Sequence, residues 1–509
     1  MSSPSVASFD YIVIGAGSAG CTLAARLTEN GKFSVLLLEA GGTDRHPEVL
    51  DPVRWTSLFP GPLDWGYQSQ PISACDLRVD HVPRAKMLGG CHSHNASVWV
   101  RGHQNDYDGW LRSGCPGWGW DDVLPVFQRI ENWQGALGNS RRTGGPMYIA
   151  HPVDPHPLAV AFAGAGPLIG LPANADHNDG TLEGTAFFNL TIRNGQRFTV
   201  VDGYLNPALA RDNLTVMTGA QTTRLLLNGT RCTGVETLRS GVVQSITARR
   251  EVILSAGVIG SAQCLLSSGI GPAADLRALG IPVVVDLPGV GRNYQDHVLF
   301  AGINYECAKP LPPARNNGAE ATLWWRSRPG LDCPDIQPVL LEFPFFTPEL
   351  AARVPSANGF AIAPSIVKPQ SRGRLQLVSS DPLVAPQIDV NFLSCDADLD
   401  AMLAAVELCR ELGASSAFAE FEGREVLPGA LSRTEMLATI RQAATSYFHP
   451  VGTCRMGTGS DCVVSPTLAV HGVEQLRVVD ASIMPEIPCV NTNGPSVMIA
   501  EKAADWILA

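Results

Sequence analysis

Charged residues are scarce in this chain of 509 residues. Asp, Glu, Lys and Arg make up 17% of it and hydrophobic residues 45%, whereas an ordinary soluble domain has about 25% charged residues. No uncharged apolar run reaches the length of about 18 residues that a membrane-spanning helix needs. The composition therefore predicts a soluble globular protein, and the length predicts about two or three lobes.

Basic clusters are also missing. The 37 Lys and Arg residues stand against 48 Asp and Glu residues, which gives a formal net charge of −11. No group of basic residues is interleaved with aromatic side chains. Because nucleic acids and anionic lipid surfaces are bound through such patches, neither a nucleic acid nor a membrane is expected as a partner.

The amino terminus lacks the pattern of a secretory signal. The sequence MSSPSVASFD has no basic segment followed by an apolar stretch and a small-residue cleavage site. The 13 cysteines are an odd number spread along the chain, which is typical of reduced thiols. We therefore expect a cytoplasmic protein without a disulfide framework.

The first forty residues carry a strong local pattern. Residues 11–14 are β-branched or aromatic and run into the sequence GAGSAG, after which apolar residues recur at helical spacing. A second apolar segment at residues 35–38 ends in Glu39, which lies 19 positions after Gly20. A strand, a tight turn, a helix and a second strand ending in an acid are typical of a dinucleotide-binding βαβ unit.

Each glycine of this motif has its own physical reason. Gly15 permits the turn, Gly17 lets backbone amides approach a pyrophosphate, and Gly20 lets the helix lie close to the strand. Glu39 is expected to accept a hydrogen bond from a ribose hydroxyl. The motif alone leaves FAD and a nicotinamide cofactor open, because both present the same phosphate geometry. The predicted cofactor-binding residues of this unit are Gly15, Gly17, Ser18, Ala19, Gly20, Glu39 and Ala40.

A second glycine-rich segment, PRAKMLGGCHSHN, occupies residues 83–95. Its glycine pair indicates a close approach of the backbone to a ligand. Cys91, His92 and His94 are of metal-ligating types, but adjacent positions without a distant partner pair make poor tetrahedral geometry. No metal site is therefore expected.

This segment resembles the first signature of the glucose-methanol-choline (GMC) family of FAD oxidoreductases. Residues 257–271, GVIGSAQCLLSSGIG, resemble the second signature, although Ala262 stands where proline or serine is usual. Residues 288–297 and the tail from His449 onward are similar to the family as well, and the pieces follow the family's order. The resemblance covers nearly the whole chain and implies FAD as the cofactor.

The resemblance also implies the domain organisation. We expect an α/β fold with a Rossmann-type FAD-binding domain and a second, α+β substrate-binding domain, in which a β-sheet backed by helices forms the alcohol pocket. The FAD-binding domain is expected to be discontinuous. It takes residues 1–150, 196–298 and 447–509, and the substrate-binding domain takes residues 151–195 and 299–446.

The catalytic histidine of the family falls on His449, in the sequence YFHP. Alcohol oxidation requires one group to take the hydroxyl proton while a hydride leaves the carbon for flavin N5, and a neutral imidazole suits that role. The second active-site position falls on Asn491, whose amide can hold the substrate oxygen but cannot act as a base near neutral pH. His449 is therefore expected to be the only base.

Further residues are placed at the cofactor by the same resemblance. Asn493 or Gly494 is also expected to be the N-cap of a helix at the carboxyl end of the chain, with Pro495 in its first turn. The positive end of that helix would point at the flavin. The residues placed at the cofactor are Gly89, Gly90, His94, Asn95, Thr222, Asp480, Ala481 and Asn493.

The pair His94-Asn95 is similar to family members that oxidise choline, in which a histidine at this position carries the flavin covalently. The resemblance implies that FAD is linked through its 8α-methyl group to His94. A packed histidine beside a freely bound FAD is the alternative interpretation.

The expected substrate pocket departs from those choline-oxidising members. The glutamate that pairs with the quaternary ammonium there corresponds to Leu299, and a pocket histidine falls near Val339. Because a buried ammonium needs a carboxylate beside its aromatic cage, choline itself is not expected as the substrate.

Other residues expected in the pocket lie outside these motifs. Trp55 and the pair Trp324-Trp325 are expected to form aromatic walls. Glu306 and Glu342 are candidates for a replacement charge, but each is interpreted as a solvated surface acid.

The leading functional hypothesis is an FAD-dependent alcohol oxidase that converts a primary alcohol to an aldehyde and reduces dioxygen to hydrogen peroxide. An FAD-dependent dehydrogenase with a quinone or carrier acceptor is one alternative. A flavin-containing lyase of the same fold, which uses the base without redox chemistry, is the other. The oligomeric state is left open, with a homodimer as one option.

Overall fold

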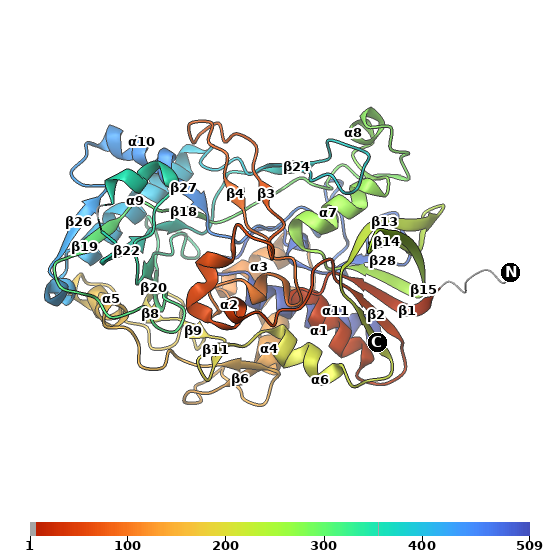
Figure 1. The fold of residues 1–509 in the computed structure, drawn as a ribbon, viewed down its shortest axis with the longest axis horizontal. Helices are drawn as coiled ribbons and strands as arrows, with labels where there is room; N and C mark the ends of the chain where they lie inside the picture. The colour runs from red at the N-terminus through yellow and green to blue at the C-terminus, as the bar shows by residue number, and fades with distance from the viewer. Residues whose placement is uncertain (1–6, 355) are drawn as a thin grey trace.

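Two β-sheets lie toward opposite ends of the long axis of the molecule (Figure 1). The computed structural model describes residues 7–354 and 356–509. One sheet has seven strands in the order β12-β2-β1-β15-β14-β13, with β28 paired to β15. The other has six strands in the order β26-β19-β22-β21-β20-β8.

The seven-stranded sheet contains the predicted βαβ unit. Strand β1 (Ser8–Ile14) pairs in parallel with β2 (Val35–Leu38), and helix α1 (Ser18–Thr28) connects them. All four residues of β2 are buried, as is typical of a parallel strand covered on both faces. The expected strands and the helix between them are therefore confirmed. The other strands are β12 (Leu214–Met217), β13 (Ala220–Asn228), β14 (Arg231–Arg239), β15 (Val242–Leu254) and β28 (Leu476–Val478).

The carboxy-terminal helix α11 (Asn493–Leu508) packs against α1 (Figure 1). Its N-cap is Thr492, one residue before Asn493 and two before Gly494, so the expectation that one of these is the cap is wrong. The reason is a tertiary contact: the Oδ1 atom of Asn493 accepts a hydrogen bond from the Ser18 hydroxyl at 2.6 Å, which joins the first turns of the two helices.

The six-stranded sheet is antiparallel throughout and is backed by helices. Helix α5 (Pro157–Leu168) packs on β8 and β20, and helix α9 (Asp396–Gly413) packs on β22. The expected sheet with helices behind it is thus confirmed. Its strands are β8 (Gly184–Phe187), β19 (Asn304–Cys307), β20 (Ala321–Trp324), β21 (Val339–Leu341), β22 (Gly359–Ala363) and β26 (Gly423–Leu427).

A short three-stranded sheet brings together distant parts of the chain that carry the expected active site. Strand β18 (Val298–Phe300) pairs with β23 (Ser365–Ile366) and with β27 (Ala444–Ser446). Val298 lies opposite Ser446 in this pairing. The register therefore places the residues just before β18 beside the residues just after β27.

All 13 cysteines are free thiols. Across residues 7–354 and 356–509, no helix combines the length and the apolar character that crossing a membrane requires.

Candidate active site

A large cavity opens at the carboxyl ends of the parallel strands and reaches the six-stranded sheet. Ile14, Leu38 and Ser255 line it at the first sheet, and Val339 and Leu341 line it at the second. This is the crevice in which α/β proteins bind their ligands. The structure brings 15 of the 17 predicted site residues to the cavity wall. The two that do not line it are Gly20 and Gly89.

The two glycine-rich segments meet at the cavity. Gly15 has a φ of +94°, and a Cβ there would lie 2.5 Å from the Ser255 carbonyl oxygen. Gly90 has a φ of +52°, and a Cβ there would lie 2.7 Å from the Cα atom of Gly17. Side chains are therefore excluded from this part of the wall, which leaves a backbone cradle suited to a pyrophosphate.

Gly20 has a packing role, as the motif predicts, because a Cβ there would lie 1.8 Å from the Gly15 carbonyl oxygen. The substitution Gly20→Ala is expected to displace α1 and to lower the free energy of unfolding by about 1–3 kcal/mol, together with the content of bound FAD. Thermal midpoint and flavin absorbance per protein measure both effects. The matched control is Gly164→Ala, in α5, where an added Cβ would have no atom within 4 Å. Equal midpoints and flavin contents in the two variants would contradict this role.

Three predicted cofactor residues carry buried polar atoms without a hydrogen-bond partner. These atoms are Nε2 of His94, Oγ1 of Thr222 and Nδ2 of Asn493. All three side chains line the cavity. Because an unpaired buried polar atom costs about 1–3 kcal/mol, a ligand that bonds to these atoms would be stabilised. The glycine cradle and these atoms fit a dinucleotide such as FAD.

Two buried carboxylates fix the backbone around the cradle. Glu39 accepts hydrogen bonds from the amides of Ala16 at 2.9 Å and Gly41 at 2.8 Å. Asp480 accepts from the Gly257 amide at 2.9 Å, and so ties the carboxy-terminal segment to α7 (Gly257–Ser267). Burial raises the pKa of both carboxyl groups. Both side chains also line the cavity, where their oxygens can accept from a ligand hydroxyl.

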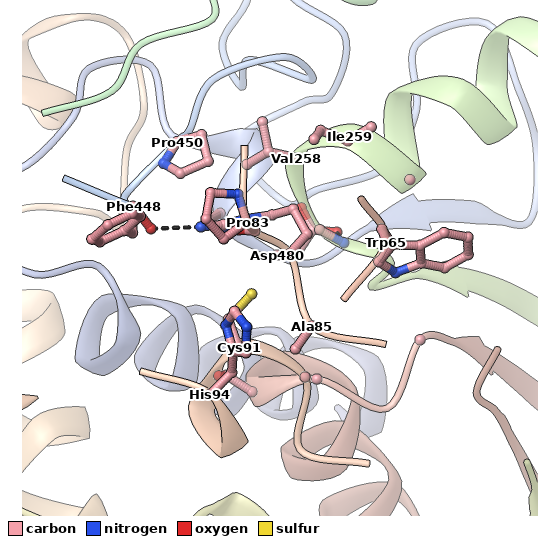
Figure 2. A pocket seen from close by; sticks show the side chains of 18 of the residues that line it. Trp65, Pro83, Ala85, Cys91, His94, Val258, Ile259, Phe448, Pro450 and Asp480 are labelled. Atoms are coloured by element: carbon pink, nitrogen blue, oxygen red, sulfur yellow. Dashed lines mark hydrogen bonds between the residues drawn. The ribbon is translucent and has the colours of Figure 1, made fainter. Parts of the chain in front are cut away.

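His449 borders the cavity just after β27 and is held from several sides. The Oδ1 atom of Asp296 accepts from its backbone amide at 2.8 Å, and Arg84 donates to the carbonyl of the preceding Phe448 at 2.7 Å (Figure 2). Phe448 has a φ of +70°, a left-handed conformation that costs a non-glycine residue about 1–3 kcal/mol. The surrounding contacts therefore fix the position of the His449 backbone. Its Nε2 atom lies 3.2 Å from Nδ2 of Asn491.

The electrostatic environment keeps this imidazole neutral. Burial lowers the pKa of His449 well below its usual range, and the neighbouring His297 and Arg84 lower it further. A neutral imidazole beside an amide donor can accept a proton at neutral pH.

Sequence reasoning missed two residues next to this pair. Nδ1 of His297 lies 3.1 Å from Nδ1 of His449, and Gln337 donates to Oδ1 of Asn491 at 3.0 Å. His297 ends the segment PGVGRNYQDH that carries part of the resemblance, so its position was a usable signal. No local pattern marks Gln337.

His94 lies at the end of the 3-10 helix Gly90–Ser93 and faces the cavity (Figure 2). Its ring packs against Phe59 with 4.8 Å between ring centroids, and burial lowers its pKa to about 3. The neighbouring His92 differs, because its Nδ1 accepts from the amide of Val200 and its Nε2 lies 3.3 Å from the Thr191 hydroxyl. Of the two histidines, His94 is therefore the one with a free ring nitrogen at the cavity.

The part of the cavity near His449 has apolar and aromatic walls. Trp55 lines it, as expected, but Trp324 and Trp325 do not. Trp324 points away because its indole donates to the Cys489 carbonyl at 3.1 Å inside the core. The walls are formed by Trp55, Phe59, Phe188, Leu299, Val339, Leu341, Phe345, Tyr447 and Phe448, which belong to a shared apolar cluster.

The interpretation of Glu342 as a solvated surface acid is wrong. Its side chain is 4% exposed, Oε2 accepts from the Arg315 amide at 2.7 Å, and burial raises its pKa to about 8. It does not line the cavity. Glu306 is half-buried and pairs with Arg424 at 2.9 Å. Among the residues described, the carboxylates that line the cavity are Glu39 and Asp480.

A Rossmann-type sheet with a glycine cradle, a second antiparallel sheet and a histidine facing their shared cavity are typical of a dinucleotide-dependent enzyme that has a base at its cofactor. Residues 9–299 match the amino-terminal family model described as GMC oxidoreductase, and residues 369–500 match the carboxy-terminal one. The chain belongs to the GMC oxidoreductase family. The predicted family, fold class and FAD cofactor are thereby confirmed.

The sequences of relatives align with nearly the whole chain. The oxygen-dependent choline dehydrogenase of Photobacterium profundum is 38% identical over 530 residues, which cover 98% of this chain and 93% of that protein. The enzyme of the same description from Brucella suis biovar 1 is 39% identical and covers 98% and 95%.

Solved structures of the family agree with the fold. Pyridoxine 4-oxidase from Mesorbium loti superposes with a TM-score of 0.94 at 34% identity, over 98% of both chains. A variant of formate oxidase from Aspergillus oryzae RIB40, described in terms of FAD modification, superposes with a TM-score of 0.90 at 27% identity, over 99% of both chains. The chain is thus similar to enzymes that are described as choline dehydrogenase, pyridoxine 4-oxidase and formate oxidase.

Proposed function

We propose that this chain is an FAD-dependent alcohol oxidase that converts a primary alcohol to its aldehyde, with His449 as the general base and dioxygen as the electron acceptor. The observation that carries the proposal is the neutral imidazole of His449, 3.2 Å from the Asn491 amide at the wall of the cofactor cavity. Bound FAD would supply the acceptor for the hydride and a route for its two electrons to dioxygen.

Side chains of the cavity wall have the other roles in the reaction. Asn491 donates from Nδ2 to the substrate hydroxyl oxygen and holds it beside His449. Nε2 of His449 takes the proton from the hydroxyl oxygen as the hydride leaves the carbon that bears this oxygen. The apolar walls formed by Leu299, Val339 and Leu341 exclude water from the reacting atoms.

The substrate class follows from those walls. The part of the cavity near His449 holds aromatic and aliphatic side chains, and both lining carboxylates lie at the cradle with backbone amides as partners. A neutral alcohol with an apolar or aromatic body fits this wall. Dioxygen as the acceptor is supported by relatives that are described as oxygen-dependent or as oxidases.

An anaerobic titration of the flavoprotein tests the function. Primary alcohols, including aromatic carbinols and polyols, are added without oxygen while the long-wavelength flavin absorbance is followed. At least one alcohol is expected to bleach it, and admitting air should restore the colour and release peroxide. Bleaching without peroxide release would replace dioxygen with a quinone or carrier acceptor. If no alcohol bleaches the flavin, a flavin-containing lyase is the remaining function.

We also propose that His94 carries the FAD covalently through the 8α-methyl group. Its free Nε2 atom at the cavity wall supports the attachment. After acid precipitation, the yellow colour is expected in the pellet of the natural protein and in the supernatant of His94→Ala. His92→Asn is the matched control, and it should keep the colour in the pellet. Colour in the supernatant of the natural protein would exclude the link.

A further inference from the structure

We propose that His297 is a positioning residue that sets the tautomer of His449, so that Nε2 of His449 is unprotonated and faces the substrate. The inference rests on the proposed function, because it concerns the base of that reaction. His297 is fully buried and does not line the cavity, so it acts only through its neighbour. The pairing of β18 with β27 brings the two histidines together across 152 positions of sequence.

The Pro488 carbonyl fixes the position of the proton on His297. Nε2 of His297 lies 2.9 Å from the carbonyl oxygen of Pro488. A carbonyl oxygen can only accept, so Nε2 of His297 carries a hydrogen and donates it. Burial lowers the pKa of His297 to about 3, and the ring therefore holds a single proton near neutral pH. Nδ1 of His297 is left with a free lone pair.

The unprotonated Nδ1 atom of His297 in turn fixes the tautomer of His449. The Nδ1 atoms of the two rings lie 3.1 Å apart, a distance that requires one hydrogen between them. His297 has none to give at that atom, so Nδ1 of His449 carries the hydrogen. Because His449 is neutral as well, its Nε2 atom has the free lone pair that a general base needs.

A separate contact favours the same tautomer. Gln337, which is fully buried, donates from Nε2 to Oδ1 of Asn491 at 3.0 Å. That bond turns the Nδ2 group of Asn491 toward His449, where it lies 3.2 Å from Nε2. An amide N–H is a donor, so the nitrogen facing it accepts from it until the substrate hydroxyl takes the place of the amide at that lone pair. The two sides of the His449 ring thus require the same arrangement of protons.

The tautomer decides whether the base can work. With the hydrogen on Nε2, His449 would present a donor to the substrate hydroxyl and could not take its proton. With the hydrogen on Nδ1, His449 takes the proton at Nε2, and the imidazolium that results still donates from Nδ1 to His297. The Pro488 carbonyl and His297 therefore stabilise both the resting and the protonated base.

Kinetics of flavin reduction test the role. His297→Leu removes the acceptor with a side chain of similar size, and we expect the limiting anaerobic rate of flavin reduction to fall roughly 10- to 100-fold with FAD content retained. His297→Asn keeps an amide oxygen as an acceptor for the Nδ1 hydrogen, and it should recover most of the rate. Equal rates in the natural protein and His297→Leu would overturn the inference, as would equal losses in the two variants.

A double variant separates this inference from the proposed function. Because His297 acts through His449, adding His297→Leu to His449→Ala should cause no further loss of rate. Additive losses would overturn the positioning role. If the flavin of His449→Ala is reduced at the natural rate, His449 is not the base and the proposed function is contradicted. If His449→Ala is slow and His297→Leu is not, the function stands and this inference fails.

Neutron diffraction from the deuterated holoenzyme tests the tautomer without any substitution. Deuterium is expected on Nε2 of His297 and on Nδ1 of His449, with none on Nε2 of His449. Deuterium on Nε2 of His449 would overturn the inference even if the His297 variants were to fold poorly.

Discussion

The variant His449→Ala is expected to retain FAD and to reduce it with substrate 10²- to 10⁴-fold more slowly than the natural protein, which corresponds to about 3–5 kcal/mol of activation free energy. Asn491 cannot replace the lost base, because an amide does not accept a proton near neutral pH. Anaerobic stopped-flow measurement of the flavin absorbance gives the rate. The exposed residue His151 supplies the control, and His151→Ala should reduce its flavin normally. An unchanged rate in His449→Ala would exclude this histidine as the base.

His449 should also determine how the rate of flavin reduction depends on pH. Burial lowers the pKa of His449 below 6.5, and the neutral form that accepts the proton is lost only when the pH falls through that lowered value. The rate of flavin reduction is therefore expected to stay level from pH 8 to about pH 6. The buried carboxyl of Asp296, with a pKa raised to about 7, titrates in this window, so Asp296→Asn is measured alongside. A half-maximal rate at or above pH 6.5 in both proteins would contradict the assignment.

The parts of the fold that the sequence predicts well are those with local causes. The βαβ unit follows from a β-branched strand, a glycine turn and a helical apolar spacing, all within residues 8–38. Gly15 and Gly20 are recognisable because each meets a close backbone approach that excludes a side chain, whereas a Cβ on Gly17 would lie at an ordinary 3.9 Å from the Gly90 Cα atom. The helix over residues 396–413 is predictable for the same reason, since its apolar periodicity is local.

The parts that the sequence does not predict depend on contacts between distant residues. Trp324 was expected in the pocket wall because it is aromatic. The hydrogen bond from its indole to the Cys489 carbonyl instead holds the side chain in the core. Because Glu342 is charged, it was expected to be solvated. Its position after β21 instead buries its side chain beside Arg315. Gln337 is an isolated amide, and only the fold brings it to Asn491.

The proposed base illustrates the same limit. A motif can identify His449, but its protonation pattern depends on His297 and on the Pro488 carbonyl, which β-strand register and loop geometry bring into contact. The chemistry of the candidate site is therefore only partly a property of its signature sequences.

Choline is expected to be a poor substrate, although relatives of this chain are described as choline dehydrogenases. Leu299 and Val339 present hydrocarbon where a cation would need a carboxylate, and the buried Glu342 lies outside the cavity wall. Aromatic rings alone return about 0.5–2 kcal/mol to a bound ammonium, while its desolvation costs several kcal/mol. We therefore expect the value of kcat/KM for choline to lie at least about 100-fold below that of its neutral isostere, in which carbon replaces the quaternary nitrogen.

The two compounds have the same shape, so their ratio of kcat/KM isolates the charge. Leu299→Glu should move the ratio toward choline, because a carboxylate would then border the ammonium, while Leu299→Gln should leave the preference for the neutral alcohol in place. The Glu variant should also unfold at a lower temperature without choline and regain stability when choline is added, since the buried carboxylate then gains a partner. Equal values of kcat/KM for choline and its isostere in the natural protein would contradict the neutral pocket, and would require a carboxylate now bonded to backbone amides, Glu39 or Asp480, to face the substrate instead.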